Sequence, residues 1–154
     1  HNTYIGCTVS EKFRYYPYFK DWCNNQEYFY SKDNNGRSFQ LDKDILVKGN
    51  KIYSEDTCCF VPAEINSLLV KRNNSRGVCN LGVYFNKTKG KFVAQLNKYG
   101  KLIHLGNFDT EIEAFSVYKE QKECHIKEVA NKWKDQIDPR VYEALMNYQV
   151  EITD

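Results

Sequence analysis

The sequence predicts an α+β protein with a small, aromatic-rich ββα-like N-terminal module. A three-stranded antiparallel sheet packed on one long α-helix is expected to follow, with a short helix at the C-terminus. Three observations support this: aromatic side chains crowd the first thirty positions, three short segments of alternating polarity follow residue 80, and a helical apolar stripe begins after residue 110. A run of strands followed by a helix, without strand–helix alternation, is typical of the α+β class.

The N-terminal module lacks long aliphatic runs and is therefore expected to build its core from aromatic rings. Pro17 is expected to open a helix that ends near Asn24. The sequence Asp-Asn-Asn-Gly at residues 33–36 predicts a tight turn. Pro62 is expected to open a second helix that runs to about Val70.

Between these helices the sequence predicts a hairpin. Residues 39–42 form one expected arm and residues 51–53 the other, around a Lys-Gly-Asn turn at residues 48–50. The module is taken as residues 1–70, a basic linker as residues 71–79, and a C-terminal domain as residues 80–154.

The C-terminal domain begins with three expected strands near residues 82–86, 91–97 and 102–105, joined by turns at 87–90 and 98–100. Alternation along each strand sorts the side chains onto two faces. One face is apolar and needs a cover: Val83, Phe85, Phe92, Ala94, Leu96, Ile103 and Leu105. The other carries amides, rings and cations without a carboxylate: Tyr84, Asn86, Lys91, Val93, Gln95, Asn97, Leu102 and His104.

The expected cover is a helix of some 24 residues. Thr-Glu-Ile-Glu at residues 110–113 predicts a capping box that starts it. An apolar stripe, interrupted only by Lys122, is expected to lie across the sheet: Ile112, Phe115, Tyr118, Ile126, Val129, Ala130 and Trp133. Asp138 and Pro139 then predict the start of a last helix that ends near Tyr148.

Charge is distributed unevenly along the chain. No acidic residue lies between Glu64 and Asp109, although 20 acidic residues in 154 lead one to expect about six there. Eight of the 22 lysines and arginines fall in this acid-free segment. The segment predicts an electropositive surface and a polyanionic partner, with DNA or RNA as the first candidate. Its basic residues are Lys71, Arg72, Arg76, Lys87, Lys89, Lys91, Lys98, Lys101 and His104.

Composition excludes several classes of protein. No apolar run approaches the roughly 18 residues that a membrane span requires, so no membrane association is expected. Adjacent Cys58 and Cys59 and the lack of a regular cysteine framework predict reduced thiols inside a cell. Cys7 and Cys23 could join them around zinc, but no Cys-x-x-Cys spacing supports this, and buried thiols are favoured. His125, at the edge of the helix stripe beside Cys124, is expected to be a packed or a surface histidine rather than a ligand, and the initial His1 suggests a piece of a longer protein.

Three motifs follow one another in the C-terminal domain: Gly-Val at residues 82–83, Lys-Phe-Val-Ala-Gln-Leu at 91–96, and Leu-Gly-Asn-Phe-Asp-Thr-Glu-Ile-Glu-Ala at 105–114. With these motifs the sheet and helix resemble the Apetala/ethylene-response-factor type of DNA-binding domain over about residues 80–133. In that family the sheet, not the helix, enters the major groove. The resemblance thus points to DNA contacts by Tyr84, Asn86, Lys91, Gln95, Asn97 and His104, the residues that alternation also places on the polar face.

This chain departs from the family in the residues that read bases. Arginines of the plant members are replaced by Tyr84 and Asn86, a glutamate by Gln95 and a tryptophan by His104. Amides of Asn86, Gln95 and Asn97 suit adenine, so an A·T-leaning site is expected. Cations expected to grip phosphates are Lys71, Arg72, Arg76, Lys87, Lys89 and Lys101.

The N-terminal half has a second pattern, in residues 41–45, 49–51, 53–54 and 58–60, with Gly6, Cys7 and the rings of Phe13, Phe19 and Trp22 upstream. This pattern resembles the HNH-type endonucleases of phages and mobile introns, which often carry a DNA-binding domain of the preceding type at their C-terminus. The resemblance gives Asp42 the position of the metal-binding carboxylate and Asn50 that of the asparagine that ties the loop. Lys43 stands where those enzymes have the general-base histidine, and Thr57 where they have the last metal ligand.

Three functions remain open at this stage. The favoured one is an intracellular, phage- or mobile-element-encoded protein of the bacterial cytoplasm that binds double-stranded DNA and carries a degenerate nuclease module. The second is a magnesium-dependent nickase in which Asp42 and Asp44 hold Mg²⁺, with Asn50 in support and an unorthodox base. The third is a protein-interaction module, for example an inhibitor, that uses the same fold to bind a protein partner.

Overall fold

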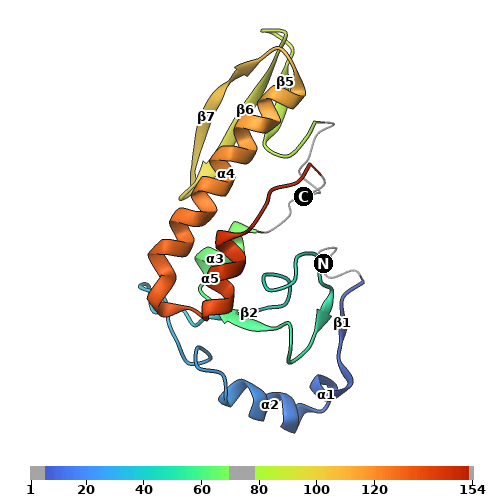
Figure 1. The fold of residues 1–154 in the computed structure, drawn as a ribbon, viewed down its shortest axis with the longest axis vertical. Helices are drawn as coiled ribbons and strands as arrows, with labels where there is room; N and C mark the ends of the chain where they lie inside the picture. Colours follow the sequence, from blue (N-terminus) through green and yellow to red (C-terminus); the bar gives the residue numbers. More distant parts are fainter. Residues whose placement is uncertain (1–5, 70–78, 153–154) are drawn as a thin grey trace. The chain divides into compact units, whose positions relative to one another are not determined.

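The structure is a computed structural model that describes residues 6–69 and 79–152. It confirms the α+β class, with a three-stranded antiparallel sheet packed on a long helix and a short C-terminal helix (Figure 1). Two compact units make up the chain. The first comprises His1–Val70 and Ala130–Met146, and the second comprises Lys71–Val129 and Asn147–Asp154. The first unit therefore includes a segment near the C-terminus that the sequence had assigned to the second domain.

The strands of the first unit form two short sheets. Strand β2 (Gln40–Asp42) pairs antiparallel with β4 (Cys59–Val61), and helix α3 (Ala63–Leu68) follows β4 directly. Strand β1 (Thr8–Val9) pairs in parallel with β3 (Ile52–Tyr53). The expected hairpin between residues 39–42 and 51–53 is thus wrong. Segment 51–53 is taken up by an N-terminal strand, and the apolar β4, with all three residues buried, is the partner of β2.

Aromatic packing forms part of the core of the first unit, as the sequence predicts. Helix α1 (Glu11–Arg14) is capped by the Ser10 hydroxyl, and helix α2 (Tyr16–Asn24) follows with Pro17 in its first turn. The buried ring of Phe13 lies 5.0 Å from Phe19 and 4.8 Å from Trp22, centroid to centroid. Trp22 in turn lies 6.0 Å from Phe60 on β4, so these rings join the helices to the strands.

The segment Ala130–Met146 completes the first unit through charged and aromatic contacts. Helix α4 (Glu111–Trp133) ends in this segment, the 3₁₀ turn η3 (Lys134–Gln136) follows, and α5 (Pro139–Met146) starts behind Asp138. The Trp133 indole packs edge-to-face on Phe39 and donates a 2.8 Å hydrogen bond to Glu64. Lys132 donates to the same carboxylate at 2.6 Å. Trp133 therefore packs in the first unit. The expectation that it lies on the three-stranded sheet is wrong.

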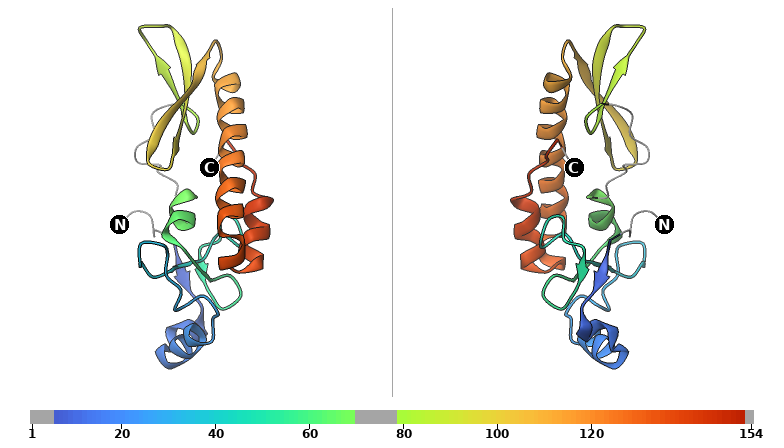
Figure 2. Two further views of the ribbon diagram at one scale, coloured as in Figure 1. Left: turned by 90° about the vertical axis from the view of Figure 1, so that its left-hand side faces the viewer. Right: turned by 90° about the vertical axis from the view of Figure 1, so that its right-hand side faces the viewer.

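The second unit contains the meander β5 (Val83–Asn86), β6 (Lys91–Lys98) and β7 (Lys101–Phe108), with β6 in the centre. Tyr99 and Gly100 join β6 to β7 with φ values of 53° and 78°, the two positive values that a tight two-residue hairpin turn requires. Figure 2 shows α4 along one face of this sheet. The capping box is confirmed, since the Glu113 amide donates to Thr110 Oγ1 and the Thr110 amide donates to Glu113.

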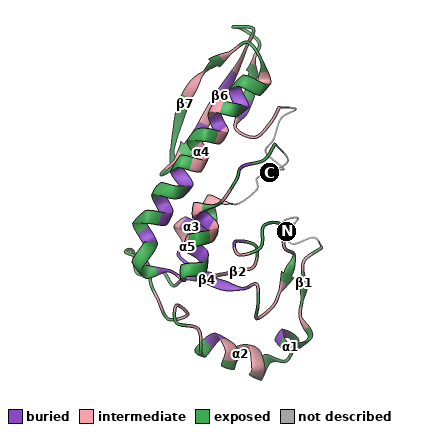
Figure 3. Ribbon diagram, in the orientation of Figure 1, coloured by how far each residue is buried: buried purple, intermediate pink, exposed green. Residues whose placement is uncertain are grey.

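The face of β6 toward α4 carries Ala94 and Leu96, both buried, while much of β7 is exposed (Figure 3). On the same face Lys98 forms a 2.6 Å ion pair with Glu128 of α4. Ile112, expected in the buried stripe, is instead 72% exposed. Ala114 is fully buried, and because successive helical residues turn by about 100°, a residue two positions earlier points nearly the opposite way.

Gly82, directly before β5, lies close against the Tyr118 ring of α4. Its φ is 72°, and a Cβ built there would overlap the ring of Tyr118. We expect Gly82→Ala to lower the free energy of unfolding by about 1–3 kcal/mol, because it combines a strained backbone with an overpacked contact. The measurement is urea unfolding followed by tryptophan fluorescence and by circular dichroism. The matched control is Gly90→Ala, which has a φ of 61° but no atom within 4 Å, and an equal loss in both variants would contradict the contact argument.

Candidate nucleic-acid interface

The face of the sheet that points away from α4, here called the outer face, is set by the strand register. Tyr84 lies opposite Val93, Gln95 opposite His104, and Asn97 opposite Leu102. Alternation then assigns the following residues to the outer face: Tyr84, Asn86, Lys91, Val93, Gln95, Asn97, Leu102, His104 and Asn107. The outer face therefore includes all six residues that the sequence had selected on β5–β7 as DNA contacts and carries no carboxylate of its own.

Exposure differs across the outer face. Asn97, His104 and Asn107 are exposed, and Gln95 is half-buried. Leu102 is 65% exposed, whereas Val93, in the centre of the face, is 1% exposed. The surface thus presents hydrogen-bonding amides and an imidazole around an inaccessible valine, and its exposed large side chains are Leu102 and the ring of Tyr84.

Asn107 is the outer-face residue that sequence alternation missed. A β-bulge between Ala94 and Gln95 leaves Leu105 without a partner on β6, so the phase of β7 changes and Asn107 lies opposite Val93. The signal in the sequence was Gly106, whose φ of 150° favours glycine and whose Cβ would crowd the Phe108 ring. The expectation that Leu105 continues the apolar face without interruption is corrected by this bulge.

Asn86 has a local structural role. Its side-chain oxygen accepts hydrogen bonds from the amides of Thr88 and Lys89, both at 3.1 Å, and so closes the turn between β5 and β6. This oxygen is one of the two groups that a bidentate contact with adenine requires. Gln95 and Asn97 form no side-chain hydrogen bond with another described residue, and their amides remain available.

The cations near the outer face fall into two groups. Lys87, Lys89 and Lys101 are exposed at the ends of the strands and pair with no acidic group of the described residues. Lys91 forms an ion pair with Asp109, and Lys98, which lies on the face toward α4, forms one with Glu128. Asp109 directly follows the acid-free segment, and Glu128 belongs to α4. Three further expected phosphate contacts, Lys71, Arg72 and Arg76, lie outside the described residues.

The candidate nuclease site in the first unit is a closed hydrogen-bonded loop. Asp42, at the end of β2, accepts hydrogen bonds from the amides of Asp44 at 2.8 Å and Ile45 at 2.9 Å. The Asn50 side chain donates to the carbonyls of Lys43 at 2.6 Å and Ile52 at 2.8 Å, so it ties the two ends of the loop together. Burial, and then the charge of Asp44, raise the pKa of Asp42 above its ordinary value.

Lys43 is unsuited to act as a general base. Its ammonium lies 3.3 Å from Asp44 and 5.6 Å from the centre of the Tyr53 ring. Burial opposes the charged form and the Asp44 carboxylate favours it, and the net effect raises the pKa of Lys43 above that of an ordinary lysine. A base must be unprotonated near neutral pH, and this amine is not.

Metal ligands do not converge at this loop. Among residues 6–69 and 79–152 no three His, Cys, Asp or Glu side chains are placed to share a metal ion. Thr57, at the last ligand position, donates to the Ile52 carbonyl instead. Cys23, Cys58 and Cys59 are buried free thiols, and burial raises the pKa of Cys58 to about 11. These cysteines have the character of core residues rather than of zinc ligands.

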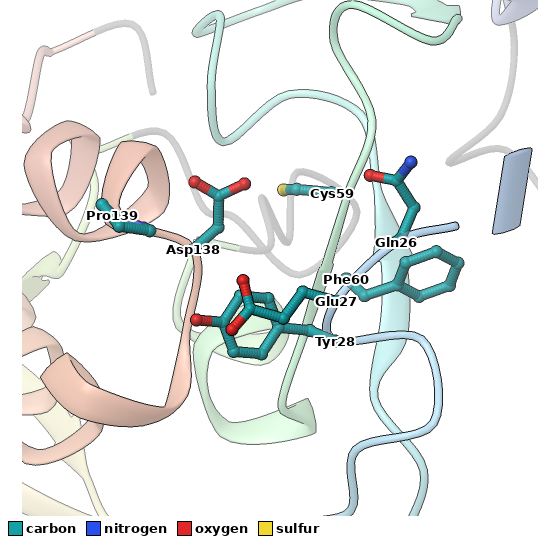
Figure 4. Close-up of a pocket in the computed structure, with 7 residues that line it drawn as sticks. All are labelled: Gln26, Glu27, Tyr28, Cys59, Phe60, Asp138 and Pro139. Carbon is teal, nitrogen blue, oxygen red and sulfur yellow. The ribbon is translucent and has the colours of Figure 1, made fainter. Parts of the chain in front are cut away.

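The first unit also has a cavity of about 230 Å³. Figure 4 shows its lining, in which Asp42 and Asn50 take no part: Gln26, Glu27, Tyr28, Cys59, Phe60, Asp138 and Pro139. The Asp138 carboxylate is already engaged by the Arg140 guanidinium at 2.6 Å. Burial, and then the charge of Glu27, raise the pKa of Tyr28. The cavity therefore has an acidic lining but no reactive group set free for chemistry.

Comparison of the chain with protein-family models, with curated proteins and with solved structures found no match. In the part of the chain that the structure describes, none of the helices is both long and apolar enough to cross a lipid bilayer.

The absence of a usable base on Lys43 leads to a prediction about cleavage. We expect supercoiled plasmid incubated with the chain and Mg²⁺ to stay supercoiled, both with the unaltered chain and with Asp42→Ala, as measured by agarose electrophoresis. Nicking by the unaltered chain that Asp42→Ala abolishes would overturn this expectation and establish the nickase function.

His125 leads to a prediction about stability. Its ring is 3% exposed, packs edge-to-face on Tyr99 at 4.9 Å, and has no hydrogen-bond partner for Nδ1, which lies 3.8 Å from Glu128. Burial, and then the charges of Lys122 and Lys98, lower the pKa of His125. Because the unfolded chain binds this proton more tightly, stability is complete above the ordinary histidine pKa of about 6.5 and falls as the pH drops through the lower folded value.

We therefore expect the urea concentration at the unfolding midpoint to decrease as the pH is lowered from 7 to 5. The slope of this midpoint against pH should become flatter in His125→Phe, which retains an aromatic ring but cannot be protonated. His104→Phe, which alters an exposed histidine, is the matched control and should keep the slope. An unchanged slope in His125→Phe would show that another group is responsible.

Proposed function

We propose that this chain is a DNA-binding protein that docks the outer face of its β5–β6–β7 sheet in the major groove. The observation that carries the proposal is the composition of that face. A 44-residue segment without acidic residues contains this sheet, and its hydrogen-bonding side chains point away from the covering helix. A narrow β-ribbon fits the major groove, where each base pair presents a distinct set of donors and acceptors.

Phosphate contact is assigned to the exposed cations at the ends of the strands. Lys87 and Lys89 lie in the β5–β6 turn, and Lys101 starts β7. These positions flank the outer face, where cations meet the two backbones of a duplex while the strands between them face the bases. Lys71, Arg72 and Arg76 are proposed to extend this set.

Base reading is assigned to Gln95 and Asn97. Each amide can pair bidentately with adenine, and the exposed Leu102 opposite Asn97 suits contact with a thymine methyl group. These three neighbours support the proposal of a site that leans toward A·T pairs. Tyr84 and His104 supply further contacts, whereas Asn86 serves the turn.

The first unit is proposed to be a degenerate module of the HNH homing-endonuclease lineage of phages. Its order of β2, β4 and α3, and the loop tied by Asn50, support this descent. The charged Lys43 argues against retained cleavage. The proposal therefore describes an intracellular binder of double-stranded DNA that needs no Mg²⁺.

Salt dependence tests the electrostatic part of the proposal. If about five or six cations neutralise phosphates, the slope of log affinity against log salt concentration should be roughly −5. The combined variant Lys87→Ala, Lys89→Ala and Lys101→Ala should reduce the slope by about 3, measured by fluorescence anisotropy with a duplex at several salt concentrations. A slope near −1 for the unaltered chain contradicts the proposal and favours a protein-interaction module.

Two control variants sharpen this experiment. Lys127→Ala removes an exposed cation from α4, away from the outer face, and should leave the slope unchanged. Asp109→Asn releases Lys91 from its ion pair and should instead increase affinity, by about two- to fivefold, because an exposed ion pair contributes little but competes directly with phosphate. If every variant changed affinity by the same amount per unit of charge, whatever its position, the result would indicate nonspecific attraction by net charge.

A further inference from the structure

Three phenylalanine side chains, here called the phenylalanine row, cross the end of the sheet nearest the β5–β6 turn. The strand register places Phe85 opposite Phe92 and Phe92 opposite Phe108. The rings of Phe85 and Phe92 lie 5.0 Å apart, centroid to centroid, with their planes tilted by 58°. Because these residues share the phase of Ala94 on β6, the row lies on the face of the sheet toward α4 and puts one aromatic ring on each strand.

Helix α4 leaves the phenylalanine row partly uncovered. Phe85 is 45% exposed, and Phe92 and Phe108 are half-buried, whereas Ala94, two residues further along β6, is fully buried. Figure 2 shows the β5–β6 turn projecting past the first turn of α4. Exposed apolar side chains that lie together, unlike single ones, are typical of binding surfaces.

The charges available beside the row are positive. Lys87 and Lys89 are exposed in the turn that follows Phe85, and they pair with no acidic group of the described residues. Three carboxylates follow Phe108 in the chain, and each already has a partner: Asp109 with Lys91, Glu111 with the Asn80 amide, and Glu113 with the Thr110 amide. A ligand that suits this surface therefore combines an aromatic face with negative charge.

We propose that the phenylalanine row stacks unpaired bases of single-stranded DNA while Lys87 and Lys89 contact its phosphates. Every nucleotide of a single strand offers a flat aromatic base and a charged phosphate, the two groups that exposed rings and cations bind together. Paired bases of a duplex stack on one another and do not offer their faces. The row is thus a second site, on the opposite side of the sheet from the outer face, and only the choice of DNA over RNA rests on the proposed function.

An abasic strand separates base stacking from charge. The full chain is titrated into fluorescein-labelled oligothymidylate, and into an oligomer of equal length that carries abasic sites in place of the thymidines, with binding followed by fluorescence anisotropy. We expect the abasic strand to bind at least about fivefold more weakly, the lower end of what stacking of one base contributes. Equal affinities would overturn the proposal, because charge alone would then account for the binding.

Substitutions of Phe85 test whether the ring itself is needed. We expect Phe85→Leu, which keeps an apolar side chain, to weaken oligothymidylate binding by about fivefold, and Phe85→Trp, which offers a larger ring, to retain it. The matched control is Tyr84→Leu, which removes the neighbouring ring on the outer face, 42% exposed, and should leave oligothymidylate binding unchanged. Circular dichroism and the urea midpoint check that each variant folds.

The results for these variants and for other ligands decide between this site and its alternatives. Unchanged binding in Phe85→Leu, or an equal loss in Tyr84→Leu, would overturn the assignment to the row. Tighter binding of oligouridylate than of oligothymidylate would overturn the choice of DNA. A chain that binds oligothymidylate but no duplex would refute the proposed function and support the row. Absence of oligothymidylate binding would overturn the row whatever the duplex result, and an apolar segment of a protein partner would then be the fitting occupant.

Discussion

Burial of one face of β6 against α4 is the constraint on which the candidate interface depends. Ala94 and Leu96 are buried on that face, and Lys98 on the same face pairs with Glu128 of the helix. Because side chains alternate across a strand, burying these positions turns Gln95 and Asn97 to the other side of the sheet. The hydrophobic effect, which acts on the covered face, thereby determines which polar groups the outer face presents.

The β-bulge adds to this alternation. Without it, β7 would present Gly106 on the outer face and direct Asn107 toward the helix side. The unpaired Leu105 shifts the phase, so that Asn107 joins His104 and Phe108 lies opposite Phe92. One extra residue in an edge strand thus adds Asn107 to the hydrogen-bonding side chains of the outer face.

In the first unit, the loop after β2 is held by its own hydrogen bonds. The Asn50 side chain donates a hydrogen bond to the Lys43 carbonyl. At the end of β2, one carboxylate oxygen of Asp42 accepts hydrogen bonds from the backbone amides of Asp44 and Ile45. Lys43 is held charged by Asp44. The ammonium of Lys43 beside Asp44 and the two hydrogen bonds of the Asn50 side chain hold the loop in one conformation.

The sequence by itself determined the features that depend on neighbours along the chain. The capping box at Thr110 and Glu113, the turn at Tyr99 and Gly100, and the helix that begins near Pro17 follow from local hydrogen bonds and backbone preferences, and the three strands follow from alternation. The tertiary structure decided the partner of β2, the exposure of Ile112, the burial of Trp133 beside Glu64 and the side on which Asn107 lies. Most of these outcomes depend on contacts between segments far apart in the chain, and the bulge, although Gly106 permits it, has a position that pairing across strands decides.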